Sequence, residues 1–149
     1  MKKYLAWILP GILVLALDQW AKSCTEDSYQ ILIPGVLALH GAKNTGAAMG
    51  LFLGKPFLVL IISLLLAGAA VFLLRSMHPK GLAALSLSLI AGGALGNMLD
   101  RVILGYVRDM FEVLFMDFYI FNVADAGIVC GAILCAFSLL FRPQDWSKA

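Results

Sequence analysis

The chain has 149 residues, of which 62% are hydrophobic and 13% charged, and its mean hydropathy is +0.93. A soluble domain is about 45–50% apolar and about 25% charged, so this composition excludes an ordinary soluble protein and indicates a membrane protein. The net charge of +2, with no stripe of basic residues, argues against a nucleic-acid partner.

Four apolar runs are long enough to cross a bilayer, which takes roughly 20 residues. These runs cover about 4–20, 57–74, 82–99 and 122–141. The second and third are separated by a short turn with Pro and Gly, whereas the other two connections are long. The sequence therefore predicts one integral membrane domain, residues 1–149, whose membrane part is all-α with four transmembrane helices.

The two long connections differ in character. The first contains the strand-like runs YQILI and VLALH, split by Pro34–Gly35, and predicts a small extramembrane β-sheet. The second, residues 101–120, is apolar and aromatic but interrupted by charges every few residues. It is too polar to span and too apolar to be fully solvated, so we expect it to lie along the membrane surface.

The basic residues predict the orientation. An even number of spans places both termini on one side. That side carries Lys2, Lys3, Arg75, Lys80, Arg142 and Lys148. The opposite side carries the other five basic residues and eight of the nine acidic ones. By the positive-inside rule, we expect cytoplasmic termini and a periplasmic sheet.

Polar residues cluster near the predicted outer ends of three spans. They are Asp18 and Lys22 in the first span, Asn97, Asp100 and Arg101 in the third, and Asn122 and Asp125 in the fourth. Within each span the spacing of three or four residues places them on one helix face. Asn44 in the first connection reaches the same depth. A structural alternative is that these residues only snorkel to water or fix helix register through ion pairs.

The chemistry available to this cluster is limited. His40 and His78 fall on opposite predicted sides, so we expect no His-based triad and no metal site, and nothing indicates a cofactor. No GxSxG motif is present. Carboxylates remain, and two held close together share a proton, so that one activates water while the other protonates the scissile carbonyl oxygen. The sequence therefore favours aspartic proteolysis.

Three acids compete for this pair. We expect Asp100 to be ion-paired with the adjacent Arg101 and so held ionised, which suits a scaffold. Asp109 follows Arg108, but neighbours in an extended segment point to opposite faces. The predicted pair is therefore Asp109 and Asp125.

Five stretches, in this order, resemble the bacterial lipoprotein signal peptidases (signal peptidase II). They are DQWAK at 18–22, NTGAAMG at 44–50, GGALGNMLDR at 92–101, GYVRD at 105–109 and FNVAD at 121–125. The resemblance implies a four-helix aspartic endopeptidase of the inner membrane, with a small periplasmic sheet and a surface half-helix. It also implies removal of signal peptides from prolipoproteins, by cutting before a diacylglyceryl-modified cysteine, with these precursors and membrane lipids as partners.

The resemblance also assigns roles to residues. It maps the catalytic pair onto Asp109 and Asp125. The supporting residues it implies are Asp18, Lys22, Asn44, Gly46, Asn97, Asp100, Arg101 and Asn122. Arg101 and the asparagines would orient the substrate backbone and the pair, and Asp18 and Lys22 would hold the site together.

Two other functions compete with this one. A catalytically silent paralogue that binds lipidated peptides would explain why Arg108 and Met110 differ from the residues usual in the family it resembles. A small proton-coupled carrier would use buried acids as a relay. Against the carrier, the sequence shows no internal repeat and places its acids at one surface rather than at mid-membrane.

Overall fold

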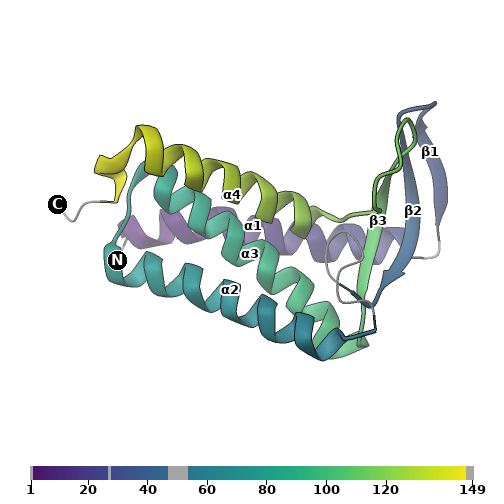
Figure 1. Cartoon of the computed structure of the whole chain (residues 1–149), viewed down its shortest axis with the longest axis horizontal. Coiled ribbons are helices and arrows are strands. Elements are labelled where there is room, and N and C mark those ends of the chain that lie inside the picture. Colours follow the sequence, from purple (N-terminus) through teal and green to yellow (C-terminus); the bar gives the residue numbers. More distant parts are fainter. Residues whose placement is uncertain (1, 27, 47–53, 147–149) are drawn as a thin grey trace.

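The computed structural model describes residues 2–26, 28–46 and 54–146 and shows a bundle of long helices with a small antiparallel sheet at one end (Figure 1). The long helices are α1 (Lys2–Thr25), α2 (Pro56–Met77), α3 (Gly81–Leu104) and α4 (Val123–Phe141). The strands are β1 (Tyr29–Ile33), β2 (Leu37–Asn44) and β3 (Val107–Val113), and a 3-10 turn, η2 (Pro143–Asp145), follows α4. Each predicted apolar run is a helix, and both predicted strands of the first connection are confirmed.

Three of the described helices are long and apolar enough to cross a membrane, namely α2, α3 and α4. The chain is therefore a multi-pass membrane protein. Helix α1 has the length but carries Asp18 and Lys22 in its C-terminal half. That α1 is a fourth span stays a prediction.

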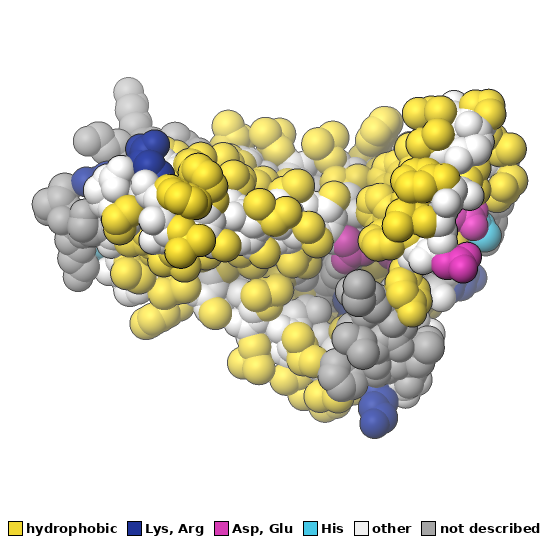
Figure 2. Space-filling view, turned by 45° about the horizontal axis from the view of Figure 1, so that its top comes forward, with side chains coloured by type: hydrophobic (Ala, Val, Ile, Leu, Met, Phe, Trp, Pro, Cys, Tyr) yellow, Lys and Arg dark blue, Asp and Glu magenta, His cyan; other side chains and the backbone are white. Residues whose placement is uncertain are grey.

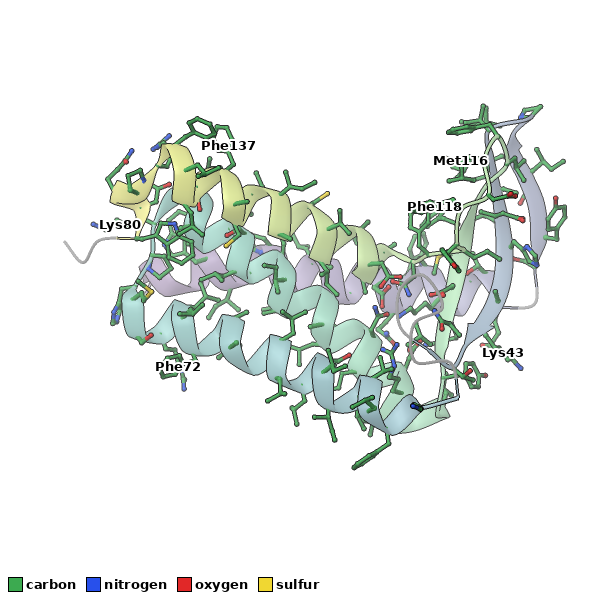
Figure 3. The ribbon with its side chains drawn as sticks, in the orientation of Figure 1. Lys43, Phe72, Lys80, Met116, Phe118 and Phe137 are labelled. Carbon is green, nitrogen blue, oxygen red and sulfur yellow. The ribbon has the colours of Figure 1, made fainter. Side chains whose placement is uncertain are left out.

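Helix α3 is the centre of the bundle, because α1, α2 and α4 all pack against it. Most of its residues are buried, whereas α2 and α4 expose large side chains such as Phe72 and Phe137, which point away from the bundle (Figure 3). Hydrophobic side chains cover most of the helical half (Figure 2). This arrangement suits a bilayer, where small residues line the helix contacts and large apolar ones face lipid.

Close helix contacts depend on glycine in α3. A Cβ at Gly92 would collide with the backbone of Gly11 in α1, and a Cβ at Gly93 would collide with the carbonyl of Ala124 in α4. At Gly96 a Cβ would lie 2.7 Å from a carboxylate oxygen of Asp18. The predicted small-residue face at Gly92 and Gly96 is therefore a helix-packing surface, and it holds α1 and α4 close to α3.

We expect Gly92→Ala to destabilise the protein, because the added methyl group can be accommodated only if α1 moves away from α3. Overpacking of this kind typically costs about 1–3 kcal/mol. The measurement is the thermal unfolding midpoint in detergent. Gly68→Ala in α2 is the matched control, since a Cβ there meets no described atom within 4 Å. Equal midpoints for the two variants would contradict this packing.

The sheet has the order β1-β2-β3, and its third strand corrects a prediction. Gly105, at φ +82°, ends α3 in the left-handed region and donates its N–H to the Arg101 carbonyl, and the chain then pairs with β2. Residues 107–113 are therefore a strand, which the sequence did not predict. Residues 105–122 are all described and contain no helix, so the surface half-helix that the resemblance implies does not lie between α3 and α4 and stays a prediction.

A short bridge ties β3 to the start of α4. Phe111 and Phe121 pair in antiparallel fashion, and the Phe121 carbonyl also accepts the Met110 N–H at 3.0 Å. This bridge fixes the first turn of α4 beside the middle of β3. The bridge thereby holds Asp109, on the strand, near Asp125, in the first turn of the helix.

Candidate active site

Acidic side chains gather where the helical half meets the sheet (Figure 2). The buried polar residues at this junction are Asp18, Lys22, Asn97, Asp100, Arg101, Asp109 and Asn122. Asn44 and Asp125 are half-buried beside them, and Gly46 is buried. The structure thus brings together every predicted site residue, from α1, α3, α4, β2 and β3. Residues 47–50 of the stretch NTGAAMG lie outside the described residues.

Asp125 is positioned by the start of α4. Asn122 is the N-cap, and its side-chain oxygen accepts the Asp125 N–H at 2.9 Å. The Asp125 carboxylate accepts the Asn122 N–H at 3.3 Å, which completes a capping box. The carboxylate therefore lies in the first turn of the helix, where the helix dipole favours negative charge.

Asp109 is positioned by the sheet. It pairs with Ala42 across β2 and β3, and its side chain is only 3% exposed. Its carboxylate accepts one hydrogen bond from the Asn44 amide at 2.9 Å and another from the Asn122 amide at 2.6 Å. Two carboxamides thus hold this carboxylate on both oxygens.

A chain of amide hydrogen bonds joins the two carboxylates. The Asn122 amide that donates to Asp109 also donates to the Asn97 side-chain oxygen at 3.0 Å. The Asn97 amide in turn donates to the Asp125 carboxylate at 2.7 Å. Asn97 and Asn122 therefore orient both carboxylates.

Burial raises the pKa of Asp109 to about 6. The nearby Asp125 carboxylate adds to the rise, and the hydrogen bonds from Asn44 and Asn122 oppose it. Burial and a neighbouring like charge are the two causes that let a carboxyl keep its proton near neutral pH. Asp109 can therefore hold or release a proton in the range where a hydrolase works.

A fully buried lysine holds the helices around this pair. The Lys22 ammonium lies 2.7 Å from Asp18, 3.3 Å from Asp100 and 3.0 Å from the Asn97 side-chain oxygen. Asp18 also accepts the backbone N–H of Ala124 at 2.9 Å, which links α1 to the start of α4. Lys22 thus joins α1 to α3, and its carboxylate partner Asp18 extends the link to α4.

Asp100 is paired as expected, but the predicted partner was wrong. Its carboxylate binds Arg108, with the backbone N–H at 3.0 Å, Nε at 3.2 Å and a terminal nitrogen at 2.8 Å. Adjacent helix residues such as Asp100 and Arg101 point in different directions. Arg101 instead donates to the Asn97 carbonyl and, at 2.7 Å, to the Gly46 carbonyl. Arg101 therefore fixes the loop after β2, where Gly46 also donates its N–H to Asn44.

The sequence did not single out Gln19, and it gave Arg108 no role at the site. The Gln19 amide donates to the Gly96 carbonyl and to both Asp18 and Asp100 at 3.1–3.2 Å, while its oxygen accepts from Arg108 at 3.2 Å. A signal existed for Gln19, which follows Asp18 directly in DQWAK. Arg108 could not be placed without knowing that residues 107–113 form a strand.

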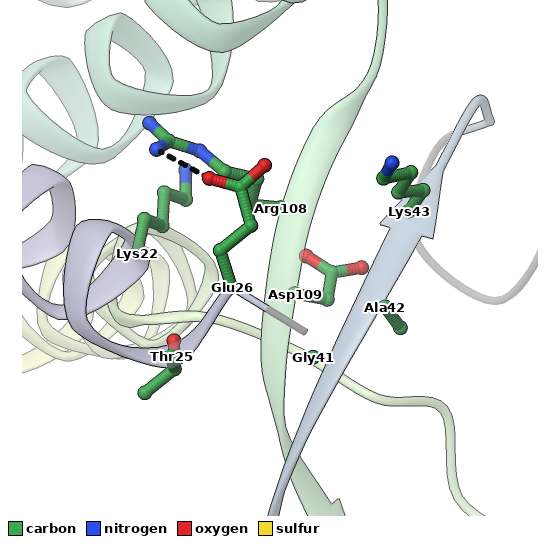
Figure 4. A pocket seen from close by; sticks show the side chains of 8 residues that line it. All are labelled: Lys22, Thr25, Glu26, Gly41, Ala42, Lys43, Arg108 and Asp109. Carbon is green, nitrogen blue, oxygen red and sulfur yellow. Dashed lines mark ion pairs between the residues drawn. The ribbon is translucent and has the colours of Figure 1, made fainter. Parts of the chain in front are cut away.

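A small cavity lies between the end of α1 and the strands β2 and β3, with Asp109 in its lining (Figure 4). Its volume is about 20 Å³, enough for one water molecule. Asp109, Thr25, Glu26 and the backbone of Gly41 and Ala42 contribute to its lining. Water can therefore approach Asp109 from the sheet side.

Two carboxylates on separate elements, joined by asparagine side chains, lie at the end of a bundle of membrane helices. Residues 11–141 match the family model described as signal peptidase (SPase) II. The chain belongs to the signal peptidase II family. It is an aspartic peptidase of the signal peptidase II type.

Relatives of this signal peptidase II chain agree over nearly its whole length. The lipoprotein signal peptidase of Enterococcus faecalis is 37% identical over 148 residues, covering 95% of this chain and 91% of that protein. The lipoprotein signal peptidase of Streptococcus thermophilus is 40% identical over 140 residues, with 90% and 91% covered. A solved bacterial membrane enzyme superposes with a TM-score of 0.85 at 30% identity, covering 97% of this chain and 93% of that structure.

Proposed function

We propose that this signal peptidase II removes signal peptides from diacylglyceryl-modified prolipoproteins by cutting before the lipidated cysteine, with Asp109 and Asp125 as its catalytic residues. One observation carries the residue assignment: Asp109 and Asp125, from different elements, are joined by the Asn122–Asn97 chain of hydrogen bonds. Asp100 is a poorer candidate, because Arg108 and Lys22 occupy both of its carboxylate oxygens.

The mechanism follows from one proton shared between two carboxyl groups. The ionised carboxylate takes a proton from water, which attacks the scissile carbonyl, and the protonated carboxyl gives its proton to the carbonyl oxygen. Collapse of the tetrahedral intermediate breaks the C–N bond and leaves a carboxylate and an amine. The amides of Asn44, Asn97 and Asn122 hold the carboxylates in place during these transfers.

Arg101 is suited to bind the substrate backbone. Its Nε is buried and has no hydrogen-bond partner among the described residues. A buried unpaired donor is rare in folded proteins. Donation from this nitrogen to a carbonyl of the substrate would orient the peptide beside the pair.

Confinement to the membrane also contributes to the specificity for lipidated substrates. A lipidated precursor stays in the bilayer, so its scissile bond arrives at a fixed depth. The site lies at the end of α3 and the start of α4, whereas α1 begins and α4 ends at the opposite end of the bundle (Figure 1). From the distribution of Lys and Arg we place those termini in the cytoplasm, with α1 as a fourth span and the site near the periplasmic surface of the inner membrane.

The test uses purified wild-type protein in detergent with two forms of one precursor, with and without the diacylglyceryl group. The expected result is a single cut immediately before the cysteine in the lipidated form, measured by the mass of the released signal peptide. Binding without cleavage would identify a silent paralogue. Proton flux in reconstituted vesicles, again without cleavage, would identify a carrier.

Asn44→Ala is expected to shift the pH–rate profile of kcat/KM to higher pH. The Asn44 amide stabilises the ionised form of Asp109, so its removal raises the pKa of Asp109, by roughly one unit for a lost hydrogen bond to a charged group. His40→Ala is the control, because His40 also lies on β2 but contacts Glu112 instead. An unchanged profile, or a shift to lower pH, would show that Asp109 does not titrate in the catalytic step.

A further inference from the structure

A second concave site lies at the opposite end of the molecule from the carboxylate pair. This end groove, of about 400 Å³, is formed by the first turns of α1 and the turn between α2 and α3. Trp7, Ile8 and Leu74 line its apolar part, and Arg75, His78 and Lys80 line its rim. The volume falls within the roughly 300–1,000 Å³ of small-molecule sites.

The groove exists because of the way the bundle is built. Helices α1 and α2 both pack against α3 rather than extensively against each other. At this end their side chains do not close the gap, and Ile8 is 51% exposed. The apolar wall therefore faces either lipid or a bound apolar chain.

The rim carries uncompensated positive charge. Arg75 lies in the last turn of α2, and Lys80 directly precedes α3, at the end of the bundle away from the sheet (Figure 3). Among the described side chains, no carboxylate forms an ion pair with either residue. Asp145 lies nearby, but its carboxylate accepts the Leu82 N–H at 3.1 Å and forms an ion pair with Arg142 at 3.6 Å rather than with Arg75 or Lys80.

These features together suit an amphiphile with a negative head. An indole such as Trp7 lies favourably at the level of lipid headgroups, and basic pockets between membrane helices favour anionic headgroups. We propose that the end groove binds one anionic phospholipid. Its acyl chain lies along Ile8 and Leu74, and its phosphate contacts Arg75 and Lys80. This proposal is independent of the catalytic assignment, because none of these residues approaches the carboxylate pair.

The test measures lipid binding to the purified protein by native mass spectrometry and by thermal shift. Phosphatidylglycerol should bind in a one-to-one complex and raise the unfolding midpoint more than phosphatidylcholine does. The Arg75→Ala/Lys80→Ala double variant should weaken phosphatidylglycerol binding at least tenfold, whereas Lys55→Ala, which removes an exposed charge at the other end of α2, should not. Equal binding of the two lipids, or unchanged binding by the double variant, would overturn the proposal.

A second variant separates a built site from general attraction of anions to a basic surface. Leu74→Trp keeps both cations but fills the apolar part of the groove, so it should also lose the one-to-one complex. If it binds phosphatidylglycerol like wild type, the groove is not the site and the proposal fails. Inorganic phosphate serves as a further probe, and a thermal shift equal to that of the lipid would also contradict a phospholipid site. The midpoint of each variant without lipid shows whether it is folded.

Discussion

Asp109→Asn and Asp125→Asn should each lower kcat for cleavage of a lipid-modified precursor by roughly 10²–10⁴-fold, while leaving substrate binding within a small factor of wild type. An amide can neither take the proton of the attacking water nor donate one as an acid. The measurement is single-turnover cleavage, with binding followed separately by fluorescence anisotropy of a labelled precursor. Retained turnover in either variant would remove that residue from the chemistry.

Glu112→Gln is the matched control for this prediction. Glu112 lies on β3 three residues after Asp109, but its carboxylate is 29% exposed and pairs with His40. The same neutralisation there should leave kcat close to wild type. A comparable loss of activity in Glu112→Gln would mean that any charge change on β3 disturbs the site.

The pH dependence of stability gives a second check on Asp109. Its pKa of about 6 lies above the unfolded value of 3.8, so the proton is bound more tightly in the folded state. This group therefore stabilises the fold below about pH 4, and that contribution is lost as the pH rises through about 6. Because Asp109→Asn lacks this ionisation, its unfolding midpoint relative to wild type should rise between about pH 4 and pH 6 and level off above that range.

Lys22→Met should produce the largest loss of stability among single substitutions that replace a charged residue with an uncharged one. It leaves the carboxylates of Asp18 and Asp100 buried without their shared ammonium group. Removing one partner of a buried ion pair costs about 3–5 kcal/mol. Asp100 retains its pair with Arg108, so the loss falls mainly on Asp18. The thermal midpoint and the yield of monodisperse protein in detergent measure the effect.

Lys55→Met is the control for that loss, because Lys55 is exposed at the start of α2. Lys22→Met/Asp18→Asn should recover part of the stability, since it removes one of the stranded charges. If Lys22→Met is as stable as Lys55→Met, the buried charge cluster does not hold α1 to α3.

The helices and most of the site could be predicted from short-range patterns. Hydropathy located the apolar runs, and the three- and four-residue spacings placed Asn97 with Asp100 and Asn122 with Asp125. The strand β3 could not be recognised in the same way, because its charged and apolar residues also suit a surface segment. Its pairing depends on β2, more than sixty residues earlier in the chain.

The position of Arg108 became clear only once residues 107–113 were known to form a strand. The sequence placed a guanidinium next to the catalytic candidate Asp109, and this departure was one of the two that supported the alternative of a silent paralogue. In the structure Arg108 turns to the opposite side of β3 and binds Asp100 and Gln19, so burial rather than the guanidinium dominates the pKa of Asp109. Met110 is fully buried and serves as a core residue. Neither departure obstructs the carboxylate pair.

The most direct test is a crystal structure with a lipidated peptide whose scissile amide is replaced by a hydroxyl-bearing isostere of the tetrahedral intermediate. The proposed chemistry predicts that the hydroxyl oxygen lies within hydrogen-bond distance of both the Asp109 and Asp125 carboxylates. The lipidated cysteine should lie directly C-terminal to the isostere. A hydroxyl bound to Asp100 or Asp18, or to only one carboxylate of the pair, would contradict the assignment of Asp109 and Asp125 as the catalytic dyad.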